Sequence, residues 1–382
     1  MQKVLIVHNK YKIKGGEDTN FAEEVNFLKS KYKLEQLIFE NSERLNFFDF
    51  IAFFTFSNRN SNQKLSNLLS EFQPDLIYIH NTWFKANLGI FKVLKKEKIN
   101  VAIKIHNFRY NCGKYFLLKN HLKNDDICTA CSIKKKKFKL FNKYFNNSYL
   151  QSIYLIIYSK KFFKILRDNP IKILAINKFH EKKLIEYGIP ENKIEILYNP
   201  FLQNNNKDSY NVKSNYIVYA GRLTKSKGVE ELLATWIESG ISGLFLKIIG
   251  TGEELEYLTK KYSNSNIEFL GELDNKQTVN IISKSKAIVT ATKMLEGQPR
   301  IFCEAFANQI PVIFPSFGGM DEYFPVDYKL KFEQFNYDSL KSIFKILNNK
   351  SELQNISREL NNHVNKEFNE DILHSRFQTL LN

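Results

Sequence analysis

Two glutamates on either side of a proline form the pattern in this sequence with the clearest chemistry. They lie in Glu296-Gly-Gln-Pro-Arg-Ile-Phe-Cys-Glu304, and Pro299 suits the first turn of a helix because its φ is fixed. The free N–H groups and the positive dipole of a helix start suit a diphosphate. Carboxylates accept hydrogen bonds from hydroxyls, so we expect Glu296 to hold a sugar and Glu304 a ribose. The expected ligand contacts from this segment are Gly297, Gln298, Pro299, Arg300, Ile301 and Glu304. An ordinary helix start with acidic residues is the alternative.

A second group of residues supplies positive charge. The segment Gly221-Arg222-Leu-Thr-Lys-Ser-Lys227-Gly228 follows a predicted strand and precedes a predicted helix. We expect Arg222 and Lys227 to neutralise a diphosphate and to stabilise it as it departs. A solvated basic loop is the alternative.

Glycines and a histidine at strand ends extend these two groups. Gly15-Gly16 follows the first predicted strand, and Gly250-Thr-Gly252 follows a later one. Glycine lets backbone N–H groups approach a phosphate or a sugar closely. His106 ends another strand and is either a ligand-binding group or an ordinary strand-end residue.

These residues require strands and helices that alternate. The sequence predicts an α/β fold of two Rossmann-like, doubly wound parallel sheets, with helices such as 18–31, 229–239 and 299–308 between the strands. Strands are predicted at 3–8, 34–39, 75–80, 101–106, 172–176 and 193–197, and again at 216–219, 244–249, 267–270, 287–290 and 311–314. Ligands of such sheets bind beyond the carboxyl ends of the strands, so both halves are expected to face one cleft.

The polar, asparagine-rich stretch between the two halves divides the chain. We predict an acceptor-side domain at 1–200, a linker at 201–214 and a nucleotide-sugar-binding domain at 215–366. A terminal helix at 367–382 is expected to pack back toward the first domain.

Taken in order, these residues resemble the family 4 glycosyltransferases of the GT-B fold, also called glycosyl transferases group 1. Glu296-x7-Glu304 is similar to that family's E-x7-E motif, and the glycines at 15–16 are similar to its N-terminal loop. The segment from His106 to Cys112 resembles the H-N-x-R-x-x-C form of polysaccharide-assembly members. The resemblance covers nearly the whole chain.

The resemblance implies a role for each group. Glu296 would hold the donor sugar, Glu304 the ribose, and His106 would support the transferred sugar. Arg222 and Lys227 would stabilise the leaving nucleoside diphosphate. It further implies transfer with retention of configuration and catalysis without a divalent metal or other cofactor. The form Glu296-Gly-Gln-Pro-Arg departs from the frequent E-G-F-G and leaves the donor sugar open.

Three of the four cysteines cluster at Cys112, Cys128 and Cys131, and His121 lies between them. The spacing of Cys128 and Cys131 is that of a zinc knuckle, so a structural zinc is one interpretation. Reduced thiols in a surface loop are the other. The low cysteine count and the absence of a signal peptide or a long apolar stretch favour a cytoplasmic protein.

The chain carries a formal net charge of +16, and its basic residues concentrate between 133 and 172 among aromatic and aliphatic ones. This segment is either a surface that docks on anionic lipid headgroups, peripheral on the inner face of a membrane, or a solvated insertion.

The function favoured by these patterns is a retaining glycosyltransferase. Its donor would be a nucleotide-diphosphate sugar, and a UDP-sugar is favoured over a GDP-sugar. Its acceptor would be a glycan or a lipid-linked molecule of cell-surface polysaccharide assembly. A basic nucleic-acid-binding protein is a second hypothesis, but no stacking groove or recognised module supports a nucleic-acid partner. A same-fold nucleotide-sugar epimerase is a third, against which the E-x7-E spacing argues.

Overall fold

The computed structural model describes residues 1–10, 16–41, 47–83, 85–106, 149–201, 214–263 and 265–381. The chain divides into two compact units. Of the described residues, unit 1 holds those within 1–106, 149–200 and 370–381, and unit 2 holds residue 201 and those within 214–369. Most of the predicted linker, 202–213, lies outside the described residues. The last helix therefore belongs to unit 1, although it follows unit 2 in the sequence.

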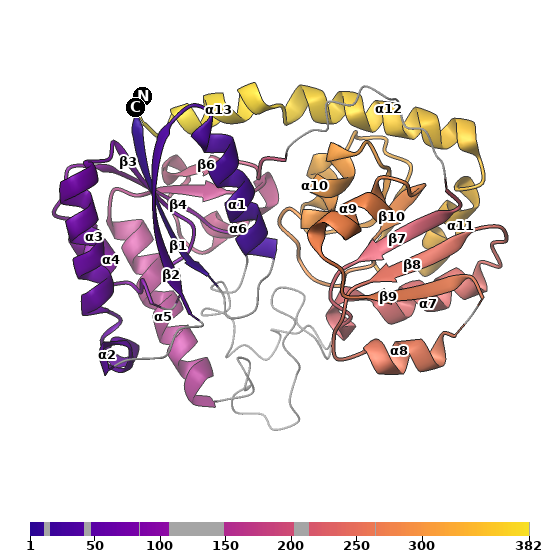
Figure 1. Ribbon diagram of the computed structural model, residues 1–382, viewed down its shortest axis with the longest axis horizontal. Coiled ribbons are helices and arrows are strands. Elements are labelled where there is room, and N and C mark those ends of the chain that lie inside the picture. The colour runs from indigo at the N-terminus through magenta and orange to yellow at the C-terminus, as the bar shows by residue number, and fades with distance from the viewer. Residues whose placement is uncertain are drawn as a thin grey trace. The chain divides into compact units, whose positions relative to one another are not determined.

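Unit 1 is a parallel six-stranded sheet in the order β2-β1-β3-β4-β5-β6. Its four central strands are buried and mainly aliphatic, as expected for the middle of a sheet that is covered on both faces. Figure 1 shows this sheet between α3 and α4 on one side and α1 on the other. Its strands are β1 (Lys3–Lys10), β2 (Lys33–Glu40), β3 (Leu76–Ile79), β4 (Asn100–Lys104), β5 (Lys172–Ala175) and β6 (Ile194–Ile196). Its helices are α1 (Gly16–Lys29), α2 (Phe47–Thr55), α3 (Arg59–Phe72), α4 (Ile90–Leu94), α5 (Tyr149–Asp168), α6 (Lys178–Glu186) and α13 (Glu370–Gln378).

Unit 2 is a second parallel six-stranded sheet, in the order β12-β11-β10-β7-β8-β9. The order reverses at β7, so β7 and β10 form a topological switch point. Figure 1 shows this sheet between α7 on one side and α9 and α10 on the other. Its strands are β7 (Tyr216–Ala220), β8 (Phe245–Ile249), β9 (Ile267–Gly271), β10 (Ala287–Val289), β11 (Val312–Ser316) and β12 (Lys331–Glu333). Its helices are α7 (Val229–Glu238), α8 (Leu255–Lys261), α9 (Asn275–Ile282), α10 (Arg300–Ala307), α11 (Tyr337–Ile346) and α12 (Lys350–Glu367).

The structure confirms the predicted fold class and the eleven predicted strands to within a few residues. The sequence analysis missed β12, which has three residues, and the helices α2, α3, α5, α11 and α12. The predicted helix at 299–308 begins one residue later, because Pro299 is its N-cap with an extended ψ of 130°.

Within unit 1, α13 supplies part of the core. Phe377 is fully buried, and its ring lies 5.2 Å from that of Tyr32 and 5.4 Å from that of Tyr78. His374 stacks on Phe27 at a centroid distance of 3.8 Å. The terminal helix therefore completes the unit that begins the chain.

No described helix of the chain is both long enough and apolar enough to cross a bilayer.

Candidate functional sites in the two units

The loops that follow β7, β8 and β10 converge at the switch point of unit 2. The Leu223 N–H donates to the Thr251 carbonyl at 2.9 Å, and the Lys293 N–H donates to the Ser226 carbonyl at 2.9 Å. These are the loops to which the sequence analysis assigned the donor-binding residues. The carboxyl ends of strands at a switch point are where ligands of open α/β sheets bind.

Glycine is sterically required where these loops touch. Gly228 has a φ of 66°, and a Cβ there would meet the carbonyl oxygen of Ala291. Gly250 has a φ of 131°, and a Cβ there would meet the Gly221 carbonyl. At Gly252 a Cβ would meet backbone atoms of Leu223. Packing between the loops is therefore sufficient to explain the glycines at these positions, whether or not a ligand binds. The absence of side chains lets the loop backbones approach each other.

Lys227 and Glu296 meet across this junction. The Lys227 ammonium donates to Glu296 Oε1 at 2.5 Å, and the Thr292 hydroxyl donates to the same oxygen at 3.0 Å. Both charged side chains are about one-fifth exposed, so the pair lies at the surface of the junction. Burial raises the pKa of the Tyr219 hydroxyl, and the nearby Glu296 carboxylate raises it further. The structure therefore brings together one predicted cation and one predicted carboxylate from loops 69 positions apart.

The predicted residues around α10 form a second pair. Arg300 Nε donates to Glu304 Oε1 at 3.2 Å, and the Gln298 amide contacts Cys303 Sγ at 3.4 Å. The side chain of Glu304 is largely buried, while Arg300 and Ile301 are partly exposed at the helix start. Arg222 lies in the β7 loop with an exposed side chain, and its carbonyl accepts a hydrogen bond from the Tyr219 hydroxyl.

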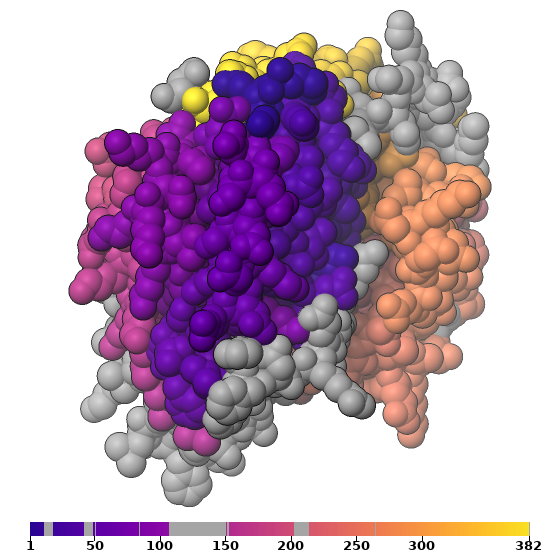
Figure 2. Space-filling model, turned by 60° about the vertical axis from the view of Figure 1, so that its left-hand side comes forward, coloured from indigo at the N-terminus to yellow at the C-terminus, as the bar shows by residue number. Residues whose placement is uncertain are grey.

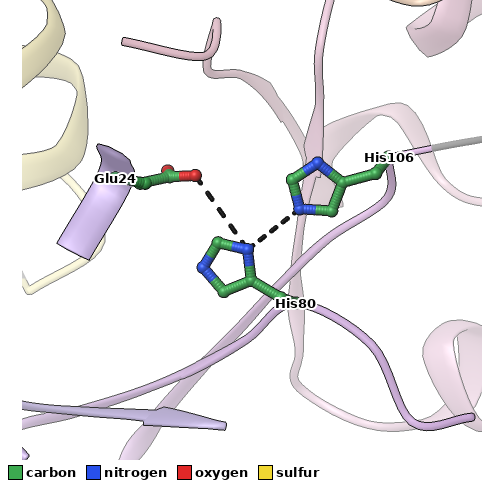
Figure 3. Close-up of side chains that lie close together, drawn as sticks. All are labelled: Glu24, His80 and His106. Carbon is green, nitrogen blue, oxygen red and sulfur yellow. Dashed lines mark hydrogen bonds and ion pairs between the residues drawn. The ribbon is translucent and has the colours of Figure 1, made fainter. Parts of the chain in front are cut away.

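Unit 1 has its own polar cluster at the carboxyl ends of β3 and β4. Lys104 donates to both oxygens of Glu24, at 3.0 and 3.1 Å, and the Tyr78 hydroxyl donates to one of them at 2.6 Å. His80 Nδ1 lies 2.9 Å from His106 Nε2 and 4.0 Å from Glu24 Oε2. Figure 3 shows that the same edge of the His80 ring faces both neighbours.

Both histidines of this cluster are neutral at pH 7. Burial, the neighbouring histidines and the Lys104 charge lower the pKa of His80 and of His106 well below the ordinary 6.5. One proton therefore lies between His80 Nδ1 and His106 Nε2. The carboxylate of Glu24, 4.0 Å from His80 Nδ1, favours that proton on His80, and in this tautomer His106 accepts at Nε2. The His106 residue is partly exposed, but its Nδ1 atom is itself buried and has no hydrogen-bond partner among the described residues.

The spacing of this cluster also suits a metal ion. One ligand atom each from Glu24, His80 and His106 lies within 4.8 Å of the others. The Lys104 ammonium, however, already binds both oxygens of the carboxylate, and a second cation would have to displace it. The cluster therefore fits the positioning of a proton on His106 better than the binding of a metal.

The sequence analysis found His106 but missed Glu24, His80 and Lys104. The available signal was that polar residues follow each apolar strand, such as His80-Asn81-Thr82 after β3. Gly16 is the first residue of α1, whereas Gly15, Cys112, Cys128 and Cys131 lie outside the described residues. The structural zinc, the site roles and the common cleft therefore stay predictions.

The chain is similar to known glycosyltransferases in sequence motif and in fold. Residues 202–362 match the model of the family "Glycosyl transferases group 1". No curated protein sequence matches the chain. Sucrose-phosphate synthase from Thermosynechococcus elongatus superposes with a TM-score of 0.69 at 13% identity, covering 100% of this chain and 98% of the synthase.

Two further solved structures share the fold. The Anabaena protein HepE, in complex with UDP and glucose, has a TM-score of 0.66 at 12% identity and covers 100% of this chain and 99% of HepE. A variant of S. aureus TarM, in complex with fondaparinux, alpha-GlcNAc-glycerol and UDP, has a TM-score of 0.60 at 14% identity. That match covers 84% of this chain, which spans 58% of the TarM length. At these identities the likeness is one of fold, which is GT-B.

Proposed function

We propose, from the premise that this protein is a glycosyltransferase with a group 1 domain at residues 202–362, that its donor is a nucleotide-diphosphate sugar. A UDP-sugar is the first choice and a GDP-sugar the second. The structures of HepE and of the TarM variant, which share the fold, both contain UDP. The proposed acceptor is a glycan or a lipid-linked molecule of cell-surface polysaccharide assembly, and the proposed location is cytoplasmic.

The observation that carries this proposal is the junction of three loops at the switch point of unit 2. A cation from the β7 loop and a carboxylate from the β10 loop meet there, and the same β10 loop, residues 290–299, leads directly into the start of α10. Lys227 and Arg222 stabilise the charge of the departing diphosphate, as fixed cations do when they are placed where charge develops. Glu296 accepts hydrogen bonds from the sugar and Glu304 from the ribose. His106 supports the transferred sugar.

Transfer with retention of configuration and without a divalent metal completes the proposal. Fixed lysine and arginine side chains then take the part that a metal ion plays in other phosphate sites. Donor hydrolysis should therefore continue in EDTA, and loss of turnover that only added magnesium or manganese restores would contradict the metal-free mechanism.

Thermal unfolding with nucleotides tests the donor. A ligand that binds only the folded protein stabilises it by about 2.7 kcal/mol at 100 times its Kd. We expect UDP to raise the Tm more than GDP or ADP, and uridine, which lacks the diphosphate, to leave it unchanged. Equal shifts with uridine and UDP would contradict a diphosphate site. No shift with any nucleoside diphosphate would contradict the donor class.

A further inference from the structure

A stripe of exposed apolar side chains runs along the first half of α5 in unit 1. Leu150, Ile153 and Ile157 are 78%, 45% and 41% exposed, and their spacing places them on one face of the helix. The opposite face, which includes Leu155 and Phe162, is buried against the rest of the unit. A buried inner face accounts for the fold of α5, but the fold does not account for the outer stripe.

Helix α2 packs beside α5 and has exposed apolar side chains of its own. Its Phe53 stacks on Tyr154 of α5 at a centroid distance of 4.0 Å, so the two helices are neighbours. Phe54 and Ile51 of α2 are 64% and 37% exposed. Figure 1 shows α2 and the start of α5 at the same end of unit 1, and Figure 2 shows this unit from the side of its outer helices. We call Ile51, Phe54, Leu150, Ile153 and Ile157 the apolar tip.

The same face of α5 becomes positively charged in its second half. Lys160, Lys161 and Lys164 are exposed and continue the helical spacing of the stripe. The Lys161 ammonium lies 4.1 Å from the centroid of the Phe56 ring, so this charge is held where the chain leaves α2. The acids in the described residues of these two helices are Asp49, which is buried and accepts from Asn58, and Asp168 at the far end of α5. The face is therefore apolar at its end and cationic one to two turns further on.

We infer that the apolar tip inserts into the surface of an anionic lipid bilayer and that the three lysines bind its headgroups. Apolar side chains of an interfacial helix enter to the boundary of headgroups and acyl chains, about 5–10 Å deep. Lysines one or two turns away from them then lie at the level of the headgroup phosphates. A protein partner would account for the apolar stripe, but the row of exposed lysines beside it, which form no ion pair with an acid of the described residues, favours an anionic surface.

Binding to a bilayer would bring the protein to the proposed lipid-linked acceptor, but the inference does not depend on the transfer reaction. Its test is a binding assay, so a failure of the donor experiment leaves it standing, and its own failure leaves the proposed donor untouched.

Flotation of the full chain with vesicles tests the inference. We expect the protein to float with vesicles of phosphatidylcholine and phosphatidylglycerol, and to float much less with phosphatidylcholine alone. The variant Leu150→Asp/Ile153→Asp should bind the mixed vesicles at least tenfold more weakly. The matched control Val326→Asp/Ile237→Asp, in which two exposed apolar residues of unit 2 change, should bind as the parent does.

A second pair of variants tests the lysines. Each basic residue near an anionic surface is worth about fivefold in affinity, so Lys160→Gln/Lys164→Gln should bind about 25-fold more weakly. Lys260→Gln/Lys276→Gln, with the same loss of charge on exposed residues of unit 2, should change the affinity by much less.

Four results would overturn the inference. The first is that the parent protein does not float with the mixed vesicles. The second is that the tip variant or the lysine variant floats as the parent does. The third is that the matched controls lose as much vesicle affinity as the variants that they accompany. The fourth is a lower Tm, or a dimer that dissociates to monomers, in Leu150→Asp/Ile153→Asp without lipid, since the tip would then be covered by protein.

Discussion

At the residue scale, the proposed chemistry depends most on the position of the Lys227 ammonium. It donates to Glu296 at 2.5 Å, whereas Lys225, in the same short 3-10 turn, is exposed. Removal of one charge-stabilising group at a transition state typically costs about 100-fold in kcat. We expect Lys227→Met to lower kcat for donor hydrolysis by about that factor.

The matched control for this variant is Lys225→Met, which removes the same charge from the neighbouring exposed position. Its kcat should stay within about threefold of the parent, which is the spread of a surface charge. Similar losses in both variants would show that only the net charge of the loop matters.

The buried pair of Glu24 and Lys104 allows a prediction about stability. The two side chains are almost fully buried, and removal of one partner leaves a buried charge without compensation. Lys104→Met should therefore lower the free energy of unfolding by about 3–5 kcal/mol. Urea denaturation measures this loss.

Glu24→Gln in the same chain should recover most of the stability, since glutamine is neutral and still accepts from the Tyr78 hydroxyl. If the double variant were as unstable as the sum of the two single ones, the carboxylate and the ammonium would not act as a unit.

At the scale of elements, the contact between the loops after β7 and β10 has a direct test. Gly228 and Gly240 have nearly the same positive φ, 66° and 60°, but a Cβ at Gly228 meets the Ala291 carbonyl and one at Gly240 meets nothing within 4 Å. Gly240→Ala should cost about 1–2 kcal/mol of stability, which is the strain of the left-handed region alone. Gly228→Ala should cost more and should also weaken UDP binding, because it separates the two loops.

The measurements for this pair are urea denaturation and the Kd of UDP. Equal stabilities, with an unchanged Kd in Gly228→Ala, would show that the loops adjust freely and that their contact does not shape the site.

At the scale of the whole molecule, the chain returns to unit 1 after it has formed unit 2. Phe377 of α13 is fully buried against Tyr32 and Tyr78. Phe377→Ala should lower the free energy of unfolding of unit 1 by about 3–5 kcal/mol, as is usual for a buried aromatic residue.

Phe54→Ala, at an exposed phenylalanine of the same unit, should change the free energy of unfolding by only about 0.5 kcal/mol. A chain that ends at residue 369 should expose the apolar patch under α13 and unfold at a lower temperature. Full stability of that shortened chain would contradict the assignment of α13 to unit 1.

The sequence by itself determined the alternation of strands and helices, because a strand buried on both faces must be a run of apolar residues. It also placed Lys227 and Glu296 in loops that follow strands and Glu304 in the helix after the second loop, because the order of strand, loop and helix fixes those positions. Those features are local, and a local pattern is sufficient to predict them.

Only the tertiary structure decided which distant residues meet. The sequence does not indicate that Lys104 neutralises Glu24, 80 positions away, or that the rings of His80 and His106 lie within hydrogen-bond distance of each other. It does not distinguish Gly228 from Gly240. Both have a positive φ in the structure, and only the contact with Ala291, in the loop after β10, makes Gly228 irreplaceable. It also leaves the outer face of α5 unassigned, because an apolar residue on a helix is core or surface only once its neighbours are placed.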